Sequence, residues 1–179
     1  MPRTIETRTT VYQYDELSPD AQEAARDWWR EGALDFYDWW DCTFQDAESI
    51  GCKIESFDCG RSQEIGFKFT VGANEVARRI LARHGKTCDT WKCAAAWVSE
   101  GNRRLRSPRL RNGKRNGHYS GDRYDSWSDA CRVFRADLAK CYLRILADEI
   151  EYLTSDESAE ETIRANEYEF TANGKRYVR

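Results

Sequence analysis

The pattern that most constrains the fold of this chain is a helical repeat of apolar residues in its C-terminal half. Between residues 126 and 153, large side chains recur at intervals of three and four, which is the spacing of one face of an α-helix. The repeat consists of Phe134, Leu138, Cys141, Tyr142, Ile145 and Leu146, and either Ser126 or Ser128 begins the segment. The sequence therefore predicts a long helix, at about 127–153, that forms the centre of the core.

Shorter helices are predicted on either side of this segment. Ser18 is a natural N-cap, with Pro19 at the first helical position, so a helix should run from there to about residue 31 with Ala21, Ala24, Ala25 and Trp28 facing inward. Thr154 and Glu157 have the spacing of a capping box and should open a last helix to about residue 165. Apolar periodicity predicts three more helices, at about 35–50, 74–84 and 89–100.

Alternating segments predict a small, mainly antiparallel sheet. Residues 52–58 and 65–71 alternate and should form a hairpin, and residues 5–14 should form a half-buried strand. Asn173-Gly174 separates two further alternating segments, 167–171 and 175–178, which is a strong hairpin signal. Together these elements predict the α+β class, with helices bundled around the long helix and packed on the sheet.

Length and composition bound the kind of protein. A chain of 179 residues suits a single domain, 1–179, and 40% hydrophobic residues exclude a wholly disordered chain. The sequence holds no apolar run of the roughly 20 residues that span a bilayer, and its start lacks the apolar stretch of a signal peptide, so we expect a cytoplasmic protein that does not enter the membrane. The sequence indicates no oligomeric state.

Charge is arranged in blocks along the chain. Residues 15–64 hold 14 acidic and 4 basic side chains, a net charge of −10, whereas residues 65–124 hold 4 acidic and 14 basic, a net charge of +10. Residues 125–179 hold 12 acidic and 8 basic, a net charge of −4. Blocks of this size can steer a charged partner over a Debye length of about 8 to 10 Å.

The basic block centres on a glycine-containing stretch without apolar periodicity, which we interpret as a loop insertion at about 101–126. Basic side chains interleaved with aromatic ones are typical of surfaces that hold phosphates and stack on bases. The residues that would bind a nucleic acid or another partner are Arg103, Arg104, Arg106, Arg109, Arg111, Lys114, Arg115, Tyr119 and Arg123. The alternative is a solvated insertion without a binding role.

An acidic and aromatic segment is the second candidate surface. Asp27-Trp28-Trp29 recurs eleven residues later as Asp38-Trp39-Trp40, and we expect Trp28 and Trp40 in the core. Trp29 and Trp39 should then be at least partly exposed, either as anchors for a partner or as caps on the edge of the core. The proposed face comprises Asp27, Trp29, Asp35, Asp38, Trp39 and Asp41, and its acidic side chains could imitate a phosphate backbone; ordinary solubility is the alternative explanation.

Catalytic and metal sites are not indicated. The seven cysteines contain no CxxC pair, and the set His84, Cys88 and Cys93 lacks a convincing fourth ligand, so we expect neither a metal nor a cofactor. Cys88 beside His84 has no supporting motif as a nucleophile and base. No catalytic triad order or phosphate-binding glycine loop appears, and the protein is expected not to be an enzyme.

Two segments, 14–29 and 151–170, resemble a family of small phage and prophage proteins that are often labelled antitoxin of a toxin–antitoxin stability system. The resemblance implies a protein that acts by binding and brings no catalytic residues. We therefore expect a phage or mobile-element inhibitor of a bacterial defence protein or ribonucleoprotein, in the manner of an anti-CRISPR protein. The alternatives are an antitoxin that neutralises a cognate toxin and a direct nucleic-acid-binding protein.

Overall fold

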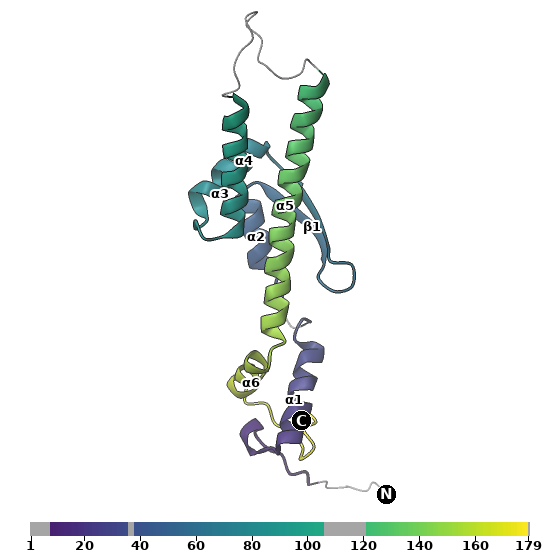
Figure 1. The fold of residues 1–179 in the computed structure, drawn as a ribbon. Coiled ribbons are helices and arrows are strands. Elements are labelled where there is room, and N and C mark those ends of the chain that lie inside the picture. The colour runs from purple at the N-terminus through teal and green to yellow at the C-terminus, as the bar shows by residue number, and fades with distance from the viewer. Residues whose placement is uncertain (1–7, 36–37, 106–120, 179) are drawn as a thin grey trace, which may run out of the picture. The chain divides into compact units, whose positions relative to one another are not determined.

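The protein is an α+β protein with six α-helices and one two-stranded antiparallel sheet among the described residues (Figure 1). The computed structural model describes residues 8–35, 38–105 and 121–178, and for residues 101–105 and 121–126 it describes the helical backbone alone. The chain divides into two compact units. The terminal unit comprises Met1–Trp39 and Asp148–Arg179, and the central unit comprises Trp40–Ala147.

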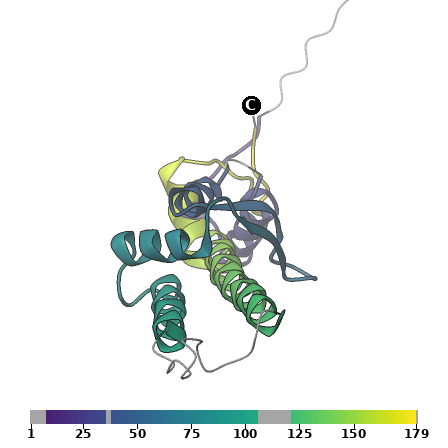
Figure 2. The ribbon, with the colours of Figure 1, turned by 90° about the horizontal axis from the view of Figure 1, so that it is seen from above.

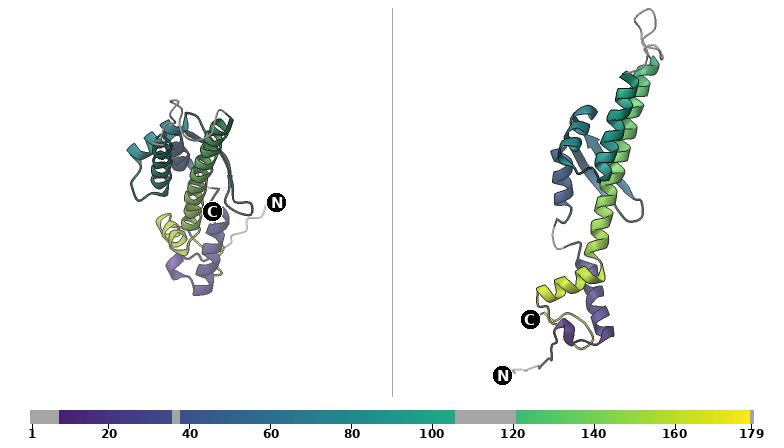
Figure 3. Two further views of the ribbon diagram at one scale, coloured as in Figure 1. Left: turned by 45° about the horizontal axis from the view of Figure 1, so that its top comes forward. Right: turned by 60° about the vertical axis from the view of Figure 1, so that its left-hand side comes forward.

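The terminal unit joins the two ends of the chain through helices α1 (Pro19–Gly32) and α6 (Asp156–Ala165). The predicted N-cap of α1 is confirmed, because the Ser18 hydroxyl accepts from the Ala21 amide at 3.4 Å. The capping box predicted from Thr154 and Glu157 is wrong in its cap: Ser155 is the N-cap of α6 and accepts from the Ser158 amide at 3.2 Å, whereas the Thr154 hydroxyl donates to the Ile150 carbonyl. Figure 3 shows α6 beside α1 in both of its views. The residues buried between the helices and the chain ends are Tyr14, Leu17, Ala21, Ala25, Trp29, Ala33, Ala159, Ile163 and Phe170.

The N-terminal and C-terminal segments pair with each other through one isolated bridge. Tyr12 and Phe170 form an isolated antiparallel bridge, with backbone hydrogen bonds of 2.8 and 2.9 Å, and Tyr14–Glu16 is a single 3-10 turn. The strand predicted at 5–14 is therefore wrong for its described residues. Of the hairpin predicted at 167–178, only the turn and one isolated antiparallel bridge, between Phe170 and Arg176, are formed, so its two strands are wrong. In the turn, Gly174 has φ +78°, and the Thr171 amide donates to the Lys175 carbonyl at 2.9 Å.

The central unit contains the sheet and the longest helix. Strands β1 (Cys52–Asp58) and β2 (Glu64–Phe69) pair antiparallel, which confirms the predicted hairpin. Helix α5 (Gly121–Leu153) packs on the sheet, because Phe67 stacks on Tyr142 with ring centroids 5.4 Å apart and Phe69 contacts Phe134 at 5.5 Å. In Figures 1 and 2, the end of the hairpin lies on one side of α5 and helices α3 and α4 lie on the other.

Three further helices complete the central unit: α2 (Asp41–Ser49), α3 (Ala73–Arg83) and α4 (Asp89–Leu105). The buried side chains that they contribute to the core include Ala47, Val76, Ala77, Ile80 and Ala94, and these pack with Ile50, Cys52 and Ile54 of the hairpin region. Helix α5 belongs to this unit up to Ala147, and its remaining residues belong to the terminal unit.

Several predicted boundaries differ from the structure. Helix α2 begins at Asp41 and not near residue 35, where the chain makes a turn. Helices α4 and α5 extend into the predicted loop at 101–126, as far as Leu105 and from Gly121, because arginine is itself a good helix former. Ile145 was expected in the core but is 41% exposed. No described helix combines the length and the apolar character needed to cross a membrane.

Candidate functional site

The terminal unit carries most of the negative charge of the protein. It contains 18 acidic and 8 basic side chains, a net charge of −10, whereas the central unit contains 13 acidic and 20 basic, a net charge of +7. Folding thus gathers acidic residues from both ends of the chain into one body. The unit therefore differs from the acidic block at 15–64, because it combines acidic residues before residue 40 with those after residue 147.

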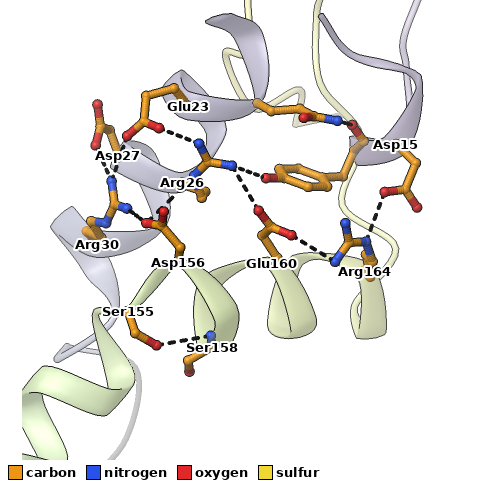
Figure 4. Close-up of polar contacts among 12 residues, drawn as sticks. Asp15, Glu23, Arg26, Asp27, Arg30, Ser155, Asp156, Ser158, Glu160 and Arg164 are labelled. Atoms are coloured by element: carbon orange, nitrogen blue, oxygen red, sulfur yellow. Dashed lines mark hydrogen bonds and ion pairs between the residues drawn. The ribbon is translucent and has the colours of Figure 1, made fainter. Parts of the chain in front are cut away.

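Three arginines of the terminal unit are held by an ion-pair network between α1 and α6 (Figure 4). Arg26 Nη1 donates to the Tyr14 hydroxyl at 2.7 Å and to Glu160 at 2.9 Å, and the same guanidinium pairs with Glu23. The other members of the network are Arg30 with Glu23, Asp27 and Asp156, and Arg164 with Asp15 and Glu160. Five carboxylates therefore surround three guanidinium groups, so the network itself remains acidic.

The pKa values within this network follow from its contacts. Hydrogen bonds from Arg26 and then Arg30 lower the pKa of Glu23. The hydrogen bond to Glu23 raises the pKa of Arg26, and burial raises the pKa of the Tyr14 phenol. These shifts favour the charged forms of Glu23 and Arg26 and the neutral form of the Tyr14 phenol.

A second set of carboxylates in the terminal unit has no ion pair with any described residue. These side chains are all exposed and are spread over α1 and the turn after it, the end of α5, α6 and the turn that follows it: Asp20, Glu31, Asp35, Asp38, Asp148, Glu149, Glu151, Glu157, Glu161 and Glu167. We call this set the unpaired carboxylates. It presents negative charge to solvent without counter-ions from the described part of the chain.

Four arginines of the terminal unit, Arg26, Arg30, Arg164 and Arg176, have partners other than the unpaired carboxylates. Arg176 lies over the rings of Trp28 and Tyr168, with its guanidinium carbon 4.8 and 4.3 Å from their centroids. Such stacking retains the cation on the aromatic surface near the end of the chain. None of these four arginines therefore neutralises the unpaired carboxylates.

The predicted acidic and aromatic face is corrected in its aromatic members. Trp29 and Trp39 are buried, at 5% and 9% exposure, whereas Trp28 and Trp40 are half-buried, which reverses the expected order. Asp35, Asp38 and Asp41 are exposed, and Asp27 is exposed but pairs with Arg30 at 2.6 Å. The exposed surface is thus acidic, without the aromatic anchors that the sequence suggested.

The predicted basic site lies mostly outside the described residues. This applies to Arg106, Arg109, Arg111, Lys114, Arg115 and Tyr119. Arg103 and Arg104 lie in the helical backbone of α4 and Arg123 in that of α5. Residues 101–126 contain eight basic and two acidic side chains, a net charge of +6, so this segment accounts for nearly all of the positive charge of the central unit.

A polar cluster in the central unit brings together a histidine, a hydroxyl group and a carboxylate, the residue types of many catalytic sites. His84 Nδ1 lies 2.7 Å from the Thr90 hydroxyl and His84 Nε2 lies 3.4 Å from Asp46, which also accepts from the Tyr142 hydroxyl at 2.6 Å. Thr90 is only 4% exposed and Tyr142 is fully buried. The hydroxyl in the position of a nucleophile is therefore closed to a substrate, and the cluster ties α2, α3, α4 and α5 together.

The cysteine and histidine set suggested by the sequence does not assemble. Cys88 is exposed, whereas the two ring nitrogens of His84 face Thr90 and Asp46. Among the described residues, no group of three or more histidine, cysteine, aspartate or glutamate side chains is placed to hold a metal ion.

Comparisons of the chain with models of protein families, with curated proteins and with solved structures found no match.

Sequence reasoning missed the unpaired carboxylates at the end of α5 and on α6. The signal was present as the net charge of −4 over residues 125–179, but nothing local indicated that these residues join those near the N-terminus.

Proposed function

We propose that the protein is a non-enzymatic inhibitor, encoded by a phage or mobile element, that binds a bacterial defence complex stoichiometrically inside the host cell. The terminal unit presents its unpaired carboxylates to a basic groove that otherwise holds nucleic acid. The observation that carries this proposal is the net charge of −10 on the terminal unit, with exposed carboxylates that no described cation neutralises.

The positions of some of these carboxylates argue for binding and against a role in stability. The C-terminal end of a helix carries partial negative charge, so acidic side chains there oppose the helix dipole. The last turn of α5 has no basic residue and contains Glu151, with Glu149 just before it, and Glu31 lies in the last turn of α1. Solubility alone does not require carboxylates at these positions, because the same charge at other exposed positions would not oppose a helix dipole.

The phage setting rests on the resemblance of residues 14–29 and 151–170. These segments lie far apart in the sequence but belong to one folded unit, in which α1 and α6 pack together and share the Arg26–Glu160 ion pair. The resemblance therefore describes one compact body, and the proposed binding surface is on that body. An antitoxin that neutralises a toxin would use the same surface in the same stoichiometric way.

A direct nucleic-acid-binding role is the second candidate, and one observation favours it. The segment 101–126, which includes the last residues of α4 and the first residues of α5, has a net charge of +6. Such a segment would bind phosphates with an affinity that falls steeply as salt rises.

The experiment that tests the proposal combines capture with a titration. The tagged protein is used to purify partners from a nuclease-treated lysate of a bacterium with an active defence system, and the nuclease activity of the captured complex is then titrated with added protein. We expect capture to survive the treatment and activity to fall linearly to an endpoint near one equivalent. Inhibition far below one equivalent would indicate an enzyme, and capture of a toxin would indicate the antitoxin.

Loss of every partner after nuclease treatment would contradict the inhibitor proposal and favour the nucleic-acid-binding role. In that case Arg103, Arg104 and Arg123, which lie on helical backbone, are the first positions for charge reversal.

A further inference from the structure

Two cysteines from different helices meet in the central unit. The sulfur atoms of Cys93 on α4 and Cys141 on α5 lie 3.7 Å apart, although the residues are 48 positions apart in the sequence. Both are free thiols and both are half-buried. Cys59 donates to the Leu143 carbonyl at 3.9 Å, but among the described residues no other two cysteines have their sulfur atoms in contact, so this pair is set apart by geometry.

The core holds the two helices in this arrangement. Trp97, one helical turn after Cys93, stacks on Phe134 with ring centroids 4.9 Å apart and an angle of 12° between the rings. On α5, Leu138 and Tyr142 beside Cys141 are fully buried. Arg144 also reaches from α5 to Asp89 at the start of α4, at 3.3 Å. The backbone positions that carry the two thiols are thus fixed by contacts that do not involve sulfur.

We propose that Cys93 and Cys141 form a reversible thiol–disulfide site that responds to low-molecular-weight disulfides such as glutathione disulfide. A disulfide requires a sulfur–sulfur distance of about 2.05 Å, and rotation about the side-chain torsions of two thiols already in contact can supply most of the remaining approach. The inference is independent of the proposed binding function, because it concerns the central unit.

The chemistry proceeds by two exchanges. One cysteine thiolate attacks a sulfur of glutathione disulfide, which breaks that bond, releases one glutathione thiolate and leaves a mixed disulfide on the protein. The second cysteine thiolate then attacks the protein sulfur of the mixed disulfide and expels the second glutathione. The two cysteines are oxidised by two electrons in total, and glutathione disulfide is reduced to two thiols that take up the two protons.

The environment of the pair makes the reaction slow. Burial raises the pKa of both thiols, to about 12 for Cys141, so the reactive thiolate is scarce at neutral pH. The second exchange is nevertheless favoured once the first has occurred, because the attacking sulfur is already adjacent. The product would link α4 to α5 across the part of the chain that contains residues 106–120.

The test begins with a background variant, Cys42→Ser with Cys88→Ser, which removes the two exposed thiols. This protein is incubated with glutathione disulfide, quenched with N-ethylmaleimide and digested with trypsin. Cleavage after Lys92 and Lys140 gives peptides that begin at Cys93 and Cys141. We expect mass spectrometry to show these two peptides joined, at a yield independent of protein concentration and reversed by dithiothreitol.

Thermal unfolding provides a second readout on the same samples. Closing a loop of this length should raise the Tm by roughly 5 °C or more. Cys93→Ser and Cys141→Ser should each abolish both the cross-link and the shift, whereas Cys131→Ser, a half-buried cysteine on the same α5, should preserve both. The proposal is overturned if the background variant, fully exposed to oxidant, carries only glutathione or N-ethylmaleimide on these two cysteines, a result that does not depend on whether any further variant folds.

Discussion

Arg26 on α1 donates a hydrogen bond of 2.9 Å to Glu160 on α6, a residue 134 positions later in the chain. The same nitrogen donates to the Tyr14 hydroxyl, and the Arg26 side chain is only 15% exposed. This contact ties the two ends of the sequence into one unit, and the acidic surface depends on that assembly.

Replacing Arg26 should therefore destabilise the terminal unit. Arg26→Ala leaves Glu160 and the Tyr14 hydroxyl without their shared donor, and loss of hydrogen bonds to a charged group should cost about 2 kcal/mol in the free energy of unfolding. Urea unfolding followed by circular dichroism measures this. Arg164→Gln is the matched control, because Arg164 pairs with Glu160 from a more exposed position, and it should cost under about 1 kcal/mol. Equal costs would show that the buried guanidinium has no special role.

Gly174 is the second position at which the terminal unit is closely constrained. Its φ is +78°, and a Cβ placed there would lie 2.1 Å from the Ala21 carbonyl oxygen on α1. Gly174→Ala should lower stability by roughly 2 kcal/mol or more, because backbone atoms of α1 would have to move. Gly72→Ala is the control, since a Cβ at Gly72 would meet nothing within 4 Å. Differential scanning calorimetry of both variants decides the matter, and a neutral Gly174→Ala would contradict the docking of this turn on α1.

The polar cluster of the central unit predicts a dependence of stability on pH. The His84 ring, whose Nε2 lies 3.4 Å from the carboxyl, and then the hydrogen bond from the Tyr142 hydroxyl lower the pKa of Asp46 in the folded protein. A carboxyl whose pKa is lowered on folding contributes stability that is present above its unfolded pKa, at about pH 4, and that is lost as pH falls through the folded value. Asp46→Asn should therefore be less stable than the parent at pH 7, by an amount that shrinks below about pH 4. Chemical unfolding measured from pH 7 to pH 3 tests this.

Glu48→Gln serves as the control for that series, because Glu48 lies on the same α2 and is exposed. Its difference from the parent should stay small across the whole pH range. A constant difference for Asp46→Asn, with no convergence in acid, would show that the carboxylate charge is not what stabilises the cluster.

The sequence predicted elements whose causes are local. Ser18 with Pro19 and the Thr154 to Glu157 segment mark helix starts by chemistry that acts within one turn. Helix α1 begins where it was expected, and α6 begins one residue later than expected because Ser155, not Thr154, is its N-cap. The hairpin of β1 and β2 and the long helix packed on it also followed from periodicity. Helical lengths were less predictable, since α4 and α5 continue through charged residues that have no apolar repeat.

The errors arose where a distant segment decides the outcome. Trp28 and Trp29 both suit the inward face of α1 by spacing, and the C-terminal segment selects between them. Tyr168 and Phe170 contact the Trp28 ring at 5.4 and 5.8 Å, and the Trp28 ring also carries Arg176. These contacts hold Trp28 at the edge of the core, and Trp29 is the buried member of the pair. For the same reason the sequence predicted only the N-terminal part of the acidic surface, since the other part comes from residues after 147.

The measurement that tests the central claim most directly is partner capture by a variant in which three unpaired carboxylates are neutralised. Glu31, Glu149 and Glu151 lie at or near C-terminal helix ends, where they oppose the helix dipole. Their replacement by glutamine should therefore leave the Tm unchanged or higher. The control carries the same change of charge on the central unit, through Glu48→Gln, Asp58→Asn and Glu64→Gln, which are exposed, have no ion pair with a described residue and lie outside the predicted acidic face.

The affinity of both variants for the captured partner is compared at equal ionic strength. The account predicts that the terminal-unit variant loses affinity by at least about tenfold, which corresponds to about 1.4 kcal/mol, while the central-unit variant retains it. Undiminished capture by the terminal-unit variant, with its stability intact, would contradict the proposal that these carboxylates form the binding surface.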